Sequence, residues 1–411
     1  MTDVLTRMRH EGVSVWLDDT GAGPGGRGTI GPDSLRPMIE AGHVVGVTSH
    51  PTLLAEAHRH EATYRARLRG LTARERTPET VVRWVAAEDI RRECDLLLPV
   101  HHRTAGRDGF VSVELDPAHA HDTRSIVREA RLVRSLIDRP NVLVQIPATA
   151  AGTRALTVCV GEGIGVDATL VFSPDRHRQV LEAYLAGLEA AEAQGRAVSD
   201  IVSVASFSVD AFDSVVDAEL AKAGTPEAKA FVGRAGLANA RLAYEVFQDV
   251  TASSRWRRLA RKGARTQRLM WVSTGACRPD RRDTLYIEEL IARDTVSTMP
   301  ACTLDALAGH GRIVGDRVRG HYADSRRILA YLRWFDIFPE AVAHQLEEEG
   351  LRRMRASWRA TLTEVRRDIR DRWVPADERR TGPAPAVPAQ NLMRSSSAQS
   401  HFLGHARVRG E

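Results

Sequence analysis

The amino-acid sequence predicts an α/β fold built on a parallel sheet. Short runs rich in Val, Ile and Leu alternate along most of the 411 residues with amphipathic segments, and this alternation is typical of parallel strands joined by helices. About eight such units indicate a closed barrel, in which chemistry takes place at the carboxyl ends of the strands. An open doubly wound sheet gives the same alternation, so the pattern alone leaves both folds open.

Seven apolar runs are expected to form strands, over residues 13–17, 44–47, 111–115, 142–146, 165–171, 201–207 and 268–272. Between them, segments such as 122–137 and 174–193 carry apolar residues at helical spacing, which predicts helices that cover the sheet. From residue 324 to 372 the pattern is continuously helical and rich in Arg, Glu, Leu and Ala. We expect this part to pack on the barrel.

The composition changes near residue 375. Residues 381–388 read TGPAPAVP and residues 395–397 are three serines, and such segments hold too little apolar surface to form a core. We therefore expect a barrel over residues 1–320, helices packed on it over 321–374, and a disordered basic tail over 375–411.

Composition excludes several classes of protein. With 43% hydrophobic residues the chain can bury a large core. Its four cysteines lie far apart without a CxxC pair, which argues against a zinc ribbon or a disulfide framework. No run approaches the roughly 18 apolar residues of a membrane span, and the N-terminus lacks a signal pattern. We expect a cytoplasmic protein that does not contact membranes.

The net charge of +5 does not indicate a nucleic-acid partner. Five arginines against Glu411 place most of that charge in the last 33 residues, and the rest of the chain is close to neutral. Interspersed arginines and acids are typical of solvated helix faces. Residues 21–26 read GAGPGG, but Pro24 interrupts this glycine pattern and no helix begins at its end, as a dinucleotide site requires. We expect a small-molecule partner and no cofactor.

Nine stretches in order resemble the transaldolase family, in particular its longer bacterial type. They are VWLDD at 15–19, HVVGVT at 43–48, VELDP at 113–117, LVQIPAT at 143–149, TLVFS at 169–173, SVASF at 203–207, WVSTG at 271–275, DTLY at 283–286 and TVSTMP at 295–300. The resemblance covers about residues 11–372 and implies a transaldolase-like (β/α)8 TIM barrel of the class I aldolase type, with extra C-terminal helices.

Four polar residues match the family's site. The resemblance implies that Asp18 is its first-strand aspartate, Glu114 its acid/base glutamate, Thr169 its threonine near the imine and Ser206 its serine at a strand end. Ser273, in the Ser-Thr-Gly run, is expected to bind substrate beside them.

Five other positions depart from the family's pattern. Gln145 stands where the family has its imine-forming lysine. His50 and Asp167 each stand where the family has an asparagine, and Ala211 and Cys277 each stand where it has a basic residue. Arg278, beside Cys277, is expected to compensate in part for the lost basic residue.

The loss of the lysine decides the chemistry. A lysine amine attacks a ketose carbonyl to form an imine, whereas the Gln145 amide offers hydrogen bonds but no basic amine. The three lysines of the chain, Lys222, Lys229 and Lys262, lie outside the predicted strands. An arginine cannot replace them, because its guanidinium stays protonated.

The other departures concern ligand charge. A hydrogen bond to a charged group contributes roughly 1.5 to 3 kcal/mol, so a phosphate should bind poorly without the guanidinium that the family has at Ala211. Asp167 joins Asp18 and Glu114 and should repel a dianion. From these residues a neutral or cationic ligand fits better.

We therefore expect a repurposed enzyme that acts on a sugar-derived or cyclitol-like, polyhydroxylated substrate in a specialised biosynthetic pathway. The residues expected to transfer protons are Asp18, Glu114, His50 and Asp167. The residues expected to bind the substrate are Gln145, Thr169, Ser206, Ser273 and Arg278. No metal is expected, because no local motif such as HExxH accompanies the histidine and carboxylates. Two alternatives stay open: a non-catalytic binding or regulatory protein, and an authentic transaldolase that transfers dihydroxyacetone between sugar phosphates. A homodimer is a further candidate arrangement.

Overall fold

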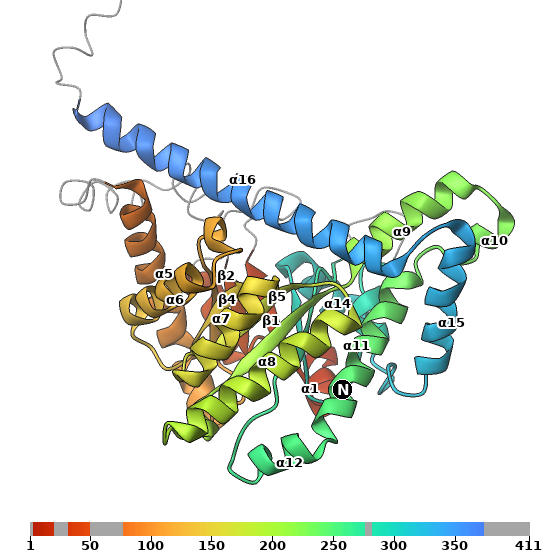
Figure 1. Ribbon diagram of the computed structural model, residues 1–411, viewed down its shortest axis with the longest axis horizontal. Helices are drawn as coiled ribbons and strands as arrows, with labels where there is room; N and C mark the ends of the chain where they lie inside the picture. Colours follow the sequence, from red (N-terminus) through yellow and green to blue (C-terminus); the bar gives the residue numbers. More distant parts are fainter. Residues whose placement is uncertain (1–2, 20–31, 50–76, 276–281, 374–411) are drawn as a thin grey trace, which may run out of the picture. The chain divides into compact units, whose positions relative to one another are not determined.

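Eight parallel strands form a closed barrel in chain order (Figure 1). The computed structural model describes residues 3–19, 32–49, 77–275 and 282–373. The ring closes between the first and last strands, where Val13 pairs with Thr295 and Leu17 with Met299. The strands are β1 (Val13–Asp19), β2 (Gly46–Ser49), β3 (Phe110–Glu114), β4 (Val142–Pro147), β5 (Val166–Val171), β6 (Ser203–Ser208), β7 (Arg268–Val272) and β8 (Thr295–Met299).

Helices alternate with the strands and cover the barrel. They are α1 (Val4–His10), α2 (Pro32–Glu40), α5 (Pro78–Arg103), η1 (Pro117–His119), α6 (Thr123–Ile137), α7 (Ala150–Gly161), α8 (Pro174–Ala193), η2 (Val198–Asp200), α9 (Asp210–Ala223), α10 (Pro226–Lys229), α11 (Ala235–Thr251), α12 (Ser254–Ala260), α13 (Leu285–Glu289), α14 (Ala301–His310), α15 (Tyr322–Leu332), η3 (Arg333–Phe335) and α16 (Pro339–Trp373). The fold is thus the predicted (β/α)8 TIM barrel with C-terminal helices.

The expected strands and helices are confirmed, with ends shifted by one or two residues. All seven apolar runs form strands, and the predicted helices over 122–137 and 174–193 are α6 and α8. Side-chain caps explain where these helices begin: Asp122 accepts from the Arg124 N–H and Ser173 from the Arg176 N–H. The strands are buried on both faces, as parallel strands covered by helices must be.

The helical pattern over residues 324–372 forms the expected C-terminal helices, α15, η3 and α16. The helical run is interrupted between Leu332 and Pro339, where η3 ends at Asp336 in the left-handed conformation, with φ 57°. Proline lacks an N–H and its ring excludes the preceding helical turn, so α16 begins at Pro339 as a new helix. Residues up to Ile369 form one compact unit, and a second unit begins at Arg370; the tail after residue 373 lies outside the described residues.

The interior of the barrel is packed at its N-terminal end. The Trp16 side chain is fully buried and stacks near Phe110, with 6.5 Å between ring centroids. Gly46 on the neighbouring strand leaves room for this indole, because a Cβ there would lie 2.4 Å from the Trp16 ring. Large aromatic side chains thus fill this end of the barrel.

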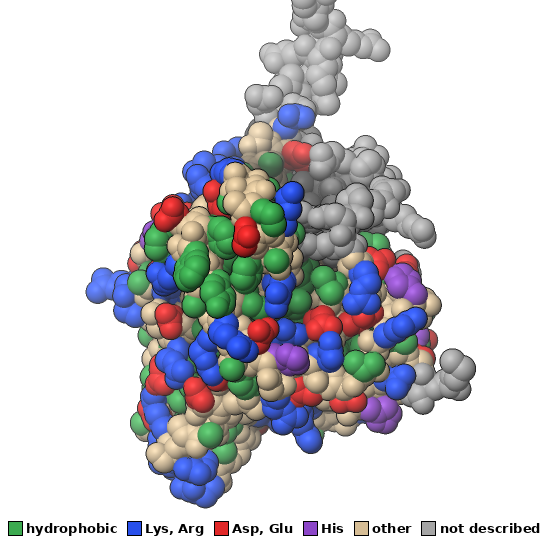
Figure 2. Space-filling view, turned by 90° about the vertical axis from the view of Figure 1, so that its right-hand side faces the viewer, with side chains coloured by type: hydrophobic (Ala, Val, Ile, Leu, Met, Phe, Trp, Pro, Cys, Tyr) green, Lys and Arg blue, Asp and Glu red, His purple; other side chains and the backbone are tan. Residues whose placement is uncertain are grey.

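The side of the molecule that carries α9, α10 and α15 exposes several hydrophobic side chains among charged ones (Figure 2). Large hydrophobic residues of this region that lie at the surface are Val232, Tyr331, Trp334 and Phe338. In the described part of the chain, no helix combines the length and the apolar character that crossing a membrane requires. The homodimer stays a prediction, because no second copy is present.

Candidate functional site

A cavity of about 350 Å³ opens at the carboxyl ends of the strands. All eight strands contribute to its wall, through Asp18, Thr48, Glu114, Gln145, Asp167, Thr169, Ser206, Ser208, Val272 and Thr298. This is the end of a (β/α)8 barrel where substrates bind, and the volume is sufficient for a small molecule. The described residues that the sequence predicted for catalysis and binding therefore meet in one cavity.

Three of these side chains form a row across neighbouring strands. Glu114 is paired in register with Gln145, and Gln145 with Asp167. Because neighbouring strands lie about 4.8 Å apart, Gln145 lies between two carboxylates. Burial differs along the row: Gln145 and Asp167 are buried, while Glu114 is half-buried.

Asp167 accepts two hydroxyl hydrogen bonds deep in the barrel. The Ser112 hydroxyl donates to its Oδ2 and the Ser206 hydroxyl to its Oδ1, both over 2.7 Å. Only 1% of Asp167 is exposed. Both carboxylate oxygens of Asp167 therefore accept hydrogen bonds from within the barrel.

Asp18 is positioned by the adjacent strand. Thr48 donates to Asp18 Oδ1 over 2.9 Å, and its hydroxyl lies 3.2 Å from that of Thr298. This chain of hydroxyls joins β1, β2 and β8 at the cavity wall. A carboxylate held this way keeps a fixed direction toward a ligand.

Two uncharged groups at the cavity have no hydrogen-bond partner among the residues that the structure describes. The Thr169 hydroxyl is buried and has no hydrogen bond among the described residues, although Thr169 is 9% exposed and lines the cavity. The Gln145 amide likewise has no hydrogen bond to a described side chain or backbone group. A buried hydroxyl without a partner costs roughly 1 to 3 kcal/mol, and a ligand that bonds to it would recover that cost.

The backbone is strained at the same cavity. Leu170 has φ 59° and Ser273 φ 55°, and both line the wall. At Leu170 the register between β5 and β6 shifts between Ala168 and Val171, as at a bulge. The left-handed conformation costs a non-glycine residue roughly 1 to 2 kcal/mol, and such strain is concentrated at functional sites.

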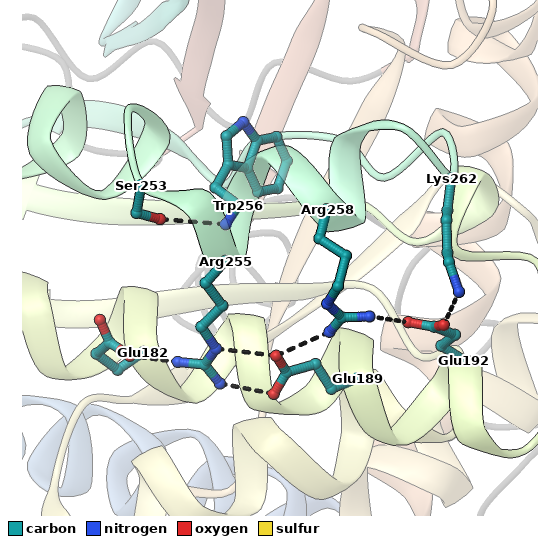
Figure 3. A network of polar contacts seen from close by, with 8 residues as sticks. All are labelled: Glu182, Glu189, Glu192, Ser253, Arg255, Trp256, Arg258 and Lys262. Carbon is teal, nitrogen blue, oxygen red and sulfur yellow. Dashed lines mark hydrogen bonds and ion pairs between the residues drawn. The ribbon is translucent and has the colours of Figure 1, made fainter.

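All three lysines lie among the described residues, and none lines the cavity. Lys222 pairs with Glu219 on the surface of α9, over 2.7 Å, and its side chain is 71% exposed. Lys229 ends the short helix α10 and is exposed. Lys262 binds Glu192 in a network of ion pairs between α8 and the α12 region (Figure 3). The described cavity wall therefore offers no amine.

Some predicted site residues lie outside the described part of the chain. These are His50, Cys277 and Arg278, together with the glycine-rich segment at 21–26. Within the described residues, no group of three or more His, Cys, Asp and Glu side chains could hold a metal ion.

Sequence reasoning missed the residues of α16. Gly350, Arg353 and Met354 line the cavity opposite the strands, and Figure 1 shows α16 crossing the end of the barrel. One signal could have indicated this. A glycine inside a helix costs about 1 kcal/mol relative to alanine, so Gly350 within a long helix rich in Arg and Glu marks a position of close packing.

Comparison with known proteins places the chain in a family. Residues 29–365 match the family described as Transaldolase/Fructose-6-phosphate aldolase. Transaldolase 1 of Streptomyces avermitilis is 46% identical over 366 residues, which cover 89% of this chain and 96% of that protein. The transaldolase of Thermobifida fusca is 45% identical over 369 residues, covering 90% of this chain and 99% of that protein. With its eight-stranded barrel and polar mouth, the chain belongs to the transaldolase/fructose-6-phosphate aldolase family.

Proposed function

We propose that this barrel catalyses proton transfers on a sugar-derived or cyclitol-like, polyhydroxylated compound without forming an imine, in a specialised biosynthetic pathway. The observation that carries the proposal is the location of the three lysines, all of them away from the cavity. Imine catalysis needs an amine within bonding distance of the substrate carbonyl. A carbonyl compound bound beside Gln145 would meet an amide instead.

The hydrogen bonds at the floor support separate roles for the carboxylates. Both oxygens of Asp167 already accept hydroxyl protons, so we assign Asp167 to charge stabilisation. Glu114 and Asp18 are only half-buried and are assigned to proton transfer, with His50 as a further relay. Gln145 would donate its amide N–H to the carbonyl oxygen of the substrate.

The simplest reaction for these groups is an isomerisation through an enediol. One carboxylate takes a proton from the carbon next to the carbonyl while an acid protonates the carbonyl oxygen. Return of a proton to the other carbon, with loss of the hydroxyl proton, moves the carbonyl by one position. No electrons enter or leave, so the groups of the cavity suffice. Thr169, Ser206, Ser273 and Arg278 would bind the substrate's oxygens.

A second candidate is transaldolase activity itself. The names of the relatives support it more directly than they support a repurposed enzyme, since proteins 45 and 46% identical to this chain are called transaldolases. This candidate requires one of the three lysines, or an unexpected route, to capture the ketose.

Two measurements on the purified full-length chain separate these functions. In the first, fructose 6-phosphate and sodium borohydride are added, and intact mass is measured. An adduct on any lysine would refute the imine-free proposal and support transaldolase activity; we expect no adduct. In the second, fructose is incubated with the protein in D₂O, and incorporation of deuterium next to the carbonyl is followed by NMR.

We expect exchange with the unchanged chain and its loss with Glu114→Gln. A matched control is Glu348→Gln, on the exposed face of α16, where the side chain is 67% exposed; this change should leave exchange intact. Neither adduct nor exchange, with fructose or with a panel of cyclitol ketones, would refute both enzymatic functions and leave the non-catalytic binding or regulatory role.

A further inference from the structure

One face of α16 forms part of the cavity wall. Gly350, Arg353 and Met354 are spaced three and four residues apart, which places them on the same side of a helix. Gly350 brings this face close to β5, because a Cβ there would lie 2.6 Å from Leu170 Cδ2. The helix thus approaches the barrel by its cavity-lining face.

Contacts along its length fix the rotation of α16. Arg176, on α8, pairs with Glu347 over 3.0 Å, and Arg355 donates to the Pro117 carbonyl over 3.3 Å. Farther along, Trp358 and Leu362 pack against valines of α5. Because contacts on both sides of Arg353 hold the helix, the place of Arg353 on the cavity wall is set by the packing of α16.

Arg353 forms no hydrogen bond or ion pair with any described residue. It is also the only basic side chain that the described residues contribute to the cavity wall. Its neighbour Arg352 is exposed, as Arg353 is, but it does not line the cavity and has Glu349 3.8 Å away. A guanidinium at the mouth of a cavity without a counter-ion is suited to bind an anion.

The distribution of charge in the cavity orients such a ligand. The carboxylates of Asp18, Glu114 and Asp167 come from strands β1, β3 and β5, whereas Arg353 comes from the helix across the mouth. An anionic group is repelled by the first set and attracted by the second. Hydroxyl and carbonyl groups, by contrast, match Gln145 and the Thr169 hydroxyl on the strands.

We propose that Arg353 binds an anionic group, phosphate or carboxylate, at the end of the ligand that faces α16, and so determines specificity. The inference rests on the proposed function in using the same cavity for the ligand. It also changes the expectation of a neutral or cationic ligand, which came from the missing guanidinium at Ala211 and from the added carboxylate of Asp167. The cation comes instead from a helix that lies more than 140 residues after Ala211 in the chain.

Isothermal titration calorimetry with three probes tests the proposal: fructose 6-phosphate, gluconate and fructose. We expect the unchanged chain to bind at least one anionic probe more tightly than fructose. Arg353→Ala should weaken that binding by roughly 10-fold to 100-fold and leave fructose unaffected. Arg352→Ala is the matched control and should change neither. Weaker binding of fructose 6-phosphate by Arg353→Ala would identify the bound group as a phosphate, and weaker binding of gluconate would identify it as a carboxylate.

Equal weakening by Arg353→Ala and Arg352→Ala, or equal weakening for fructose and the anionic probes, would overturn the assignment of Arg353. Tighter binding of fructose than of both anionic probes would overturn it as well. Because binding is measured without turnover, the result is independent of deuterium exchange: absence of exchange with the unchanged chain would refute the imine-free chemistry, while these titrations address Arg353 alone.

Discussion

Two arginines at opposite ends of the barrel, Arg268 and Arg353, differ in their contacts. At the N-terminal end, Arg268 is buried and donates to Ser14 over 2.7 Å and to Asp108 over 3.0 Å. At the C-terminal end, Arg353 faces the cavity without a partner among the described residues. The Arg268 guanidinium thus bonds to groups of the barrel itself, whereas the Arg353 guanidinium stays available to a ligand.

Two threonines, Thr295 and Thr169, show the same difference in hydrogen bonding between the two ends of the barrel. Thr295, at the start of β8, is buried and donates to the Ala292 carbonyl over 2.7 Å. Thr169, at the cavity, is buried without a partner. The paired hydroxyl of Thr295 stabilises the fold, whereas the unpaired hydroxyl of Thr169 raises the free energy of the folded chain until a ligand bonds to it.

The largest effect is expected from Arg268. Arg268→Ala leaves the Asp108 carboxylate buried without its partner, which typically costs about 3 to 5 kcal/mol. Arg353→Ala should change the free energy of unfolding by less than about 0.5 kcal/mol. Urea unfolding followed by circular dichroism measures both. Arg268→Met combined with Asp108→Leu should recover much of the loss; equal losses in Arg268→Ala and Arg353→Ala would invalidate the contrast.

The His177 imidazole is buried far from the cavity and should make stability depend on pH. Its Nδ1 lies 3.0 Å from the Ala243 carbonyl, while Nε2 has no partner in the described chain. Burial lowers the pKa of His177 to about 3. The unfolded chain takes up this proton near pH 6.5 and the folded chain does not, so the contribution to stability falls as pH drops below 6.5.

The expected loss between pH 7.5 and 5.5 is roughly 1.4 kcal/mol in the free energy of unfolding from this residue. Urea unfolding at both pH values measures it, with His177→Asn as the comparison, because asparagine does not titrate. The variant should lose less stability than the unchanged chain over this range. The same pH dependence in both proteins would show that His177 is protonated alike in the folded and unfolded states.

Valine substitutions at Thr169 and Thr295 test whether the two hydroxyls contribute differently to stability. Thr169→Val removes a hydroxyl without a partner at nearly constant volume, so we expect a gain of about 1 kcal/mol in the free energy of unfolding; Thr295→Val should lose about the same. Thermal or urea unfolding measures both variants. A loss of stability in Thr169→Val would mean that its hydroxyl is satisfied within the fold, and the cavity would then lose one of its ligand-binding groups.

Much of this molecule could be predicted from the sequence, because the strands carry a local signal. Seven Val-, Ile- and Leu-rich runs indicated strands, whereas β8, with Thr295, Ser297 and Thr298, came only from the family resemblance. The buried Thr298 hydroxyl of β8 lies 3.2 Å from that of Thr48, and periodicity cannot show such a tertiary contact.

For the cavity, the residues at strand ends were predicted because parallel strands bring their carboxyl ends together. Arg353 was not, since its role depends on how α16 packs over residues far away in sequence. The strain at Leu170 and Ser273 was also invisible, because neither residue type favours a positive φ.

The smallest expected effect concerns that strain. Ser273→Gly relieves the left-handed conformation, worth roughly 1 to 2 kcal/mol, but gives the unfolded chain more freedom, worth about 0.4 to 1 kcal/mol. We expect a net gain below about 1 kcal/mol in the free energy of unfolding. Ser208→Ala is the control, because it removes the 3.3 Å hydrogen bond between the Ser208 and Ser273 hydroxyls without changing the backbone.

If the strained conformation of Ser273 contributes to ligand binding, Ser273→Gly should weaken binding of the tightest probe more than Ser208→Ala does, while raising the free energy of unfolding. A Ser273→Gly protein that is both less stable and unchanged in affinity would show that this backbone conformation is held by the fold and contributes nothing to the mouth.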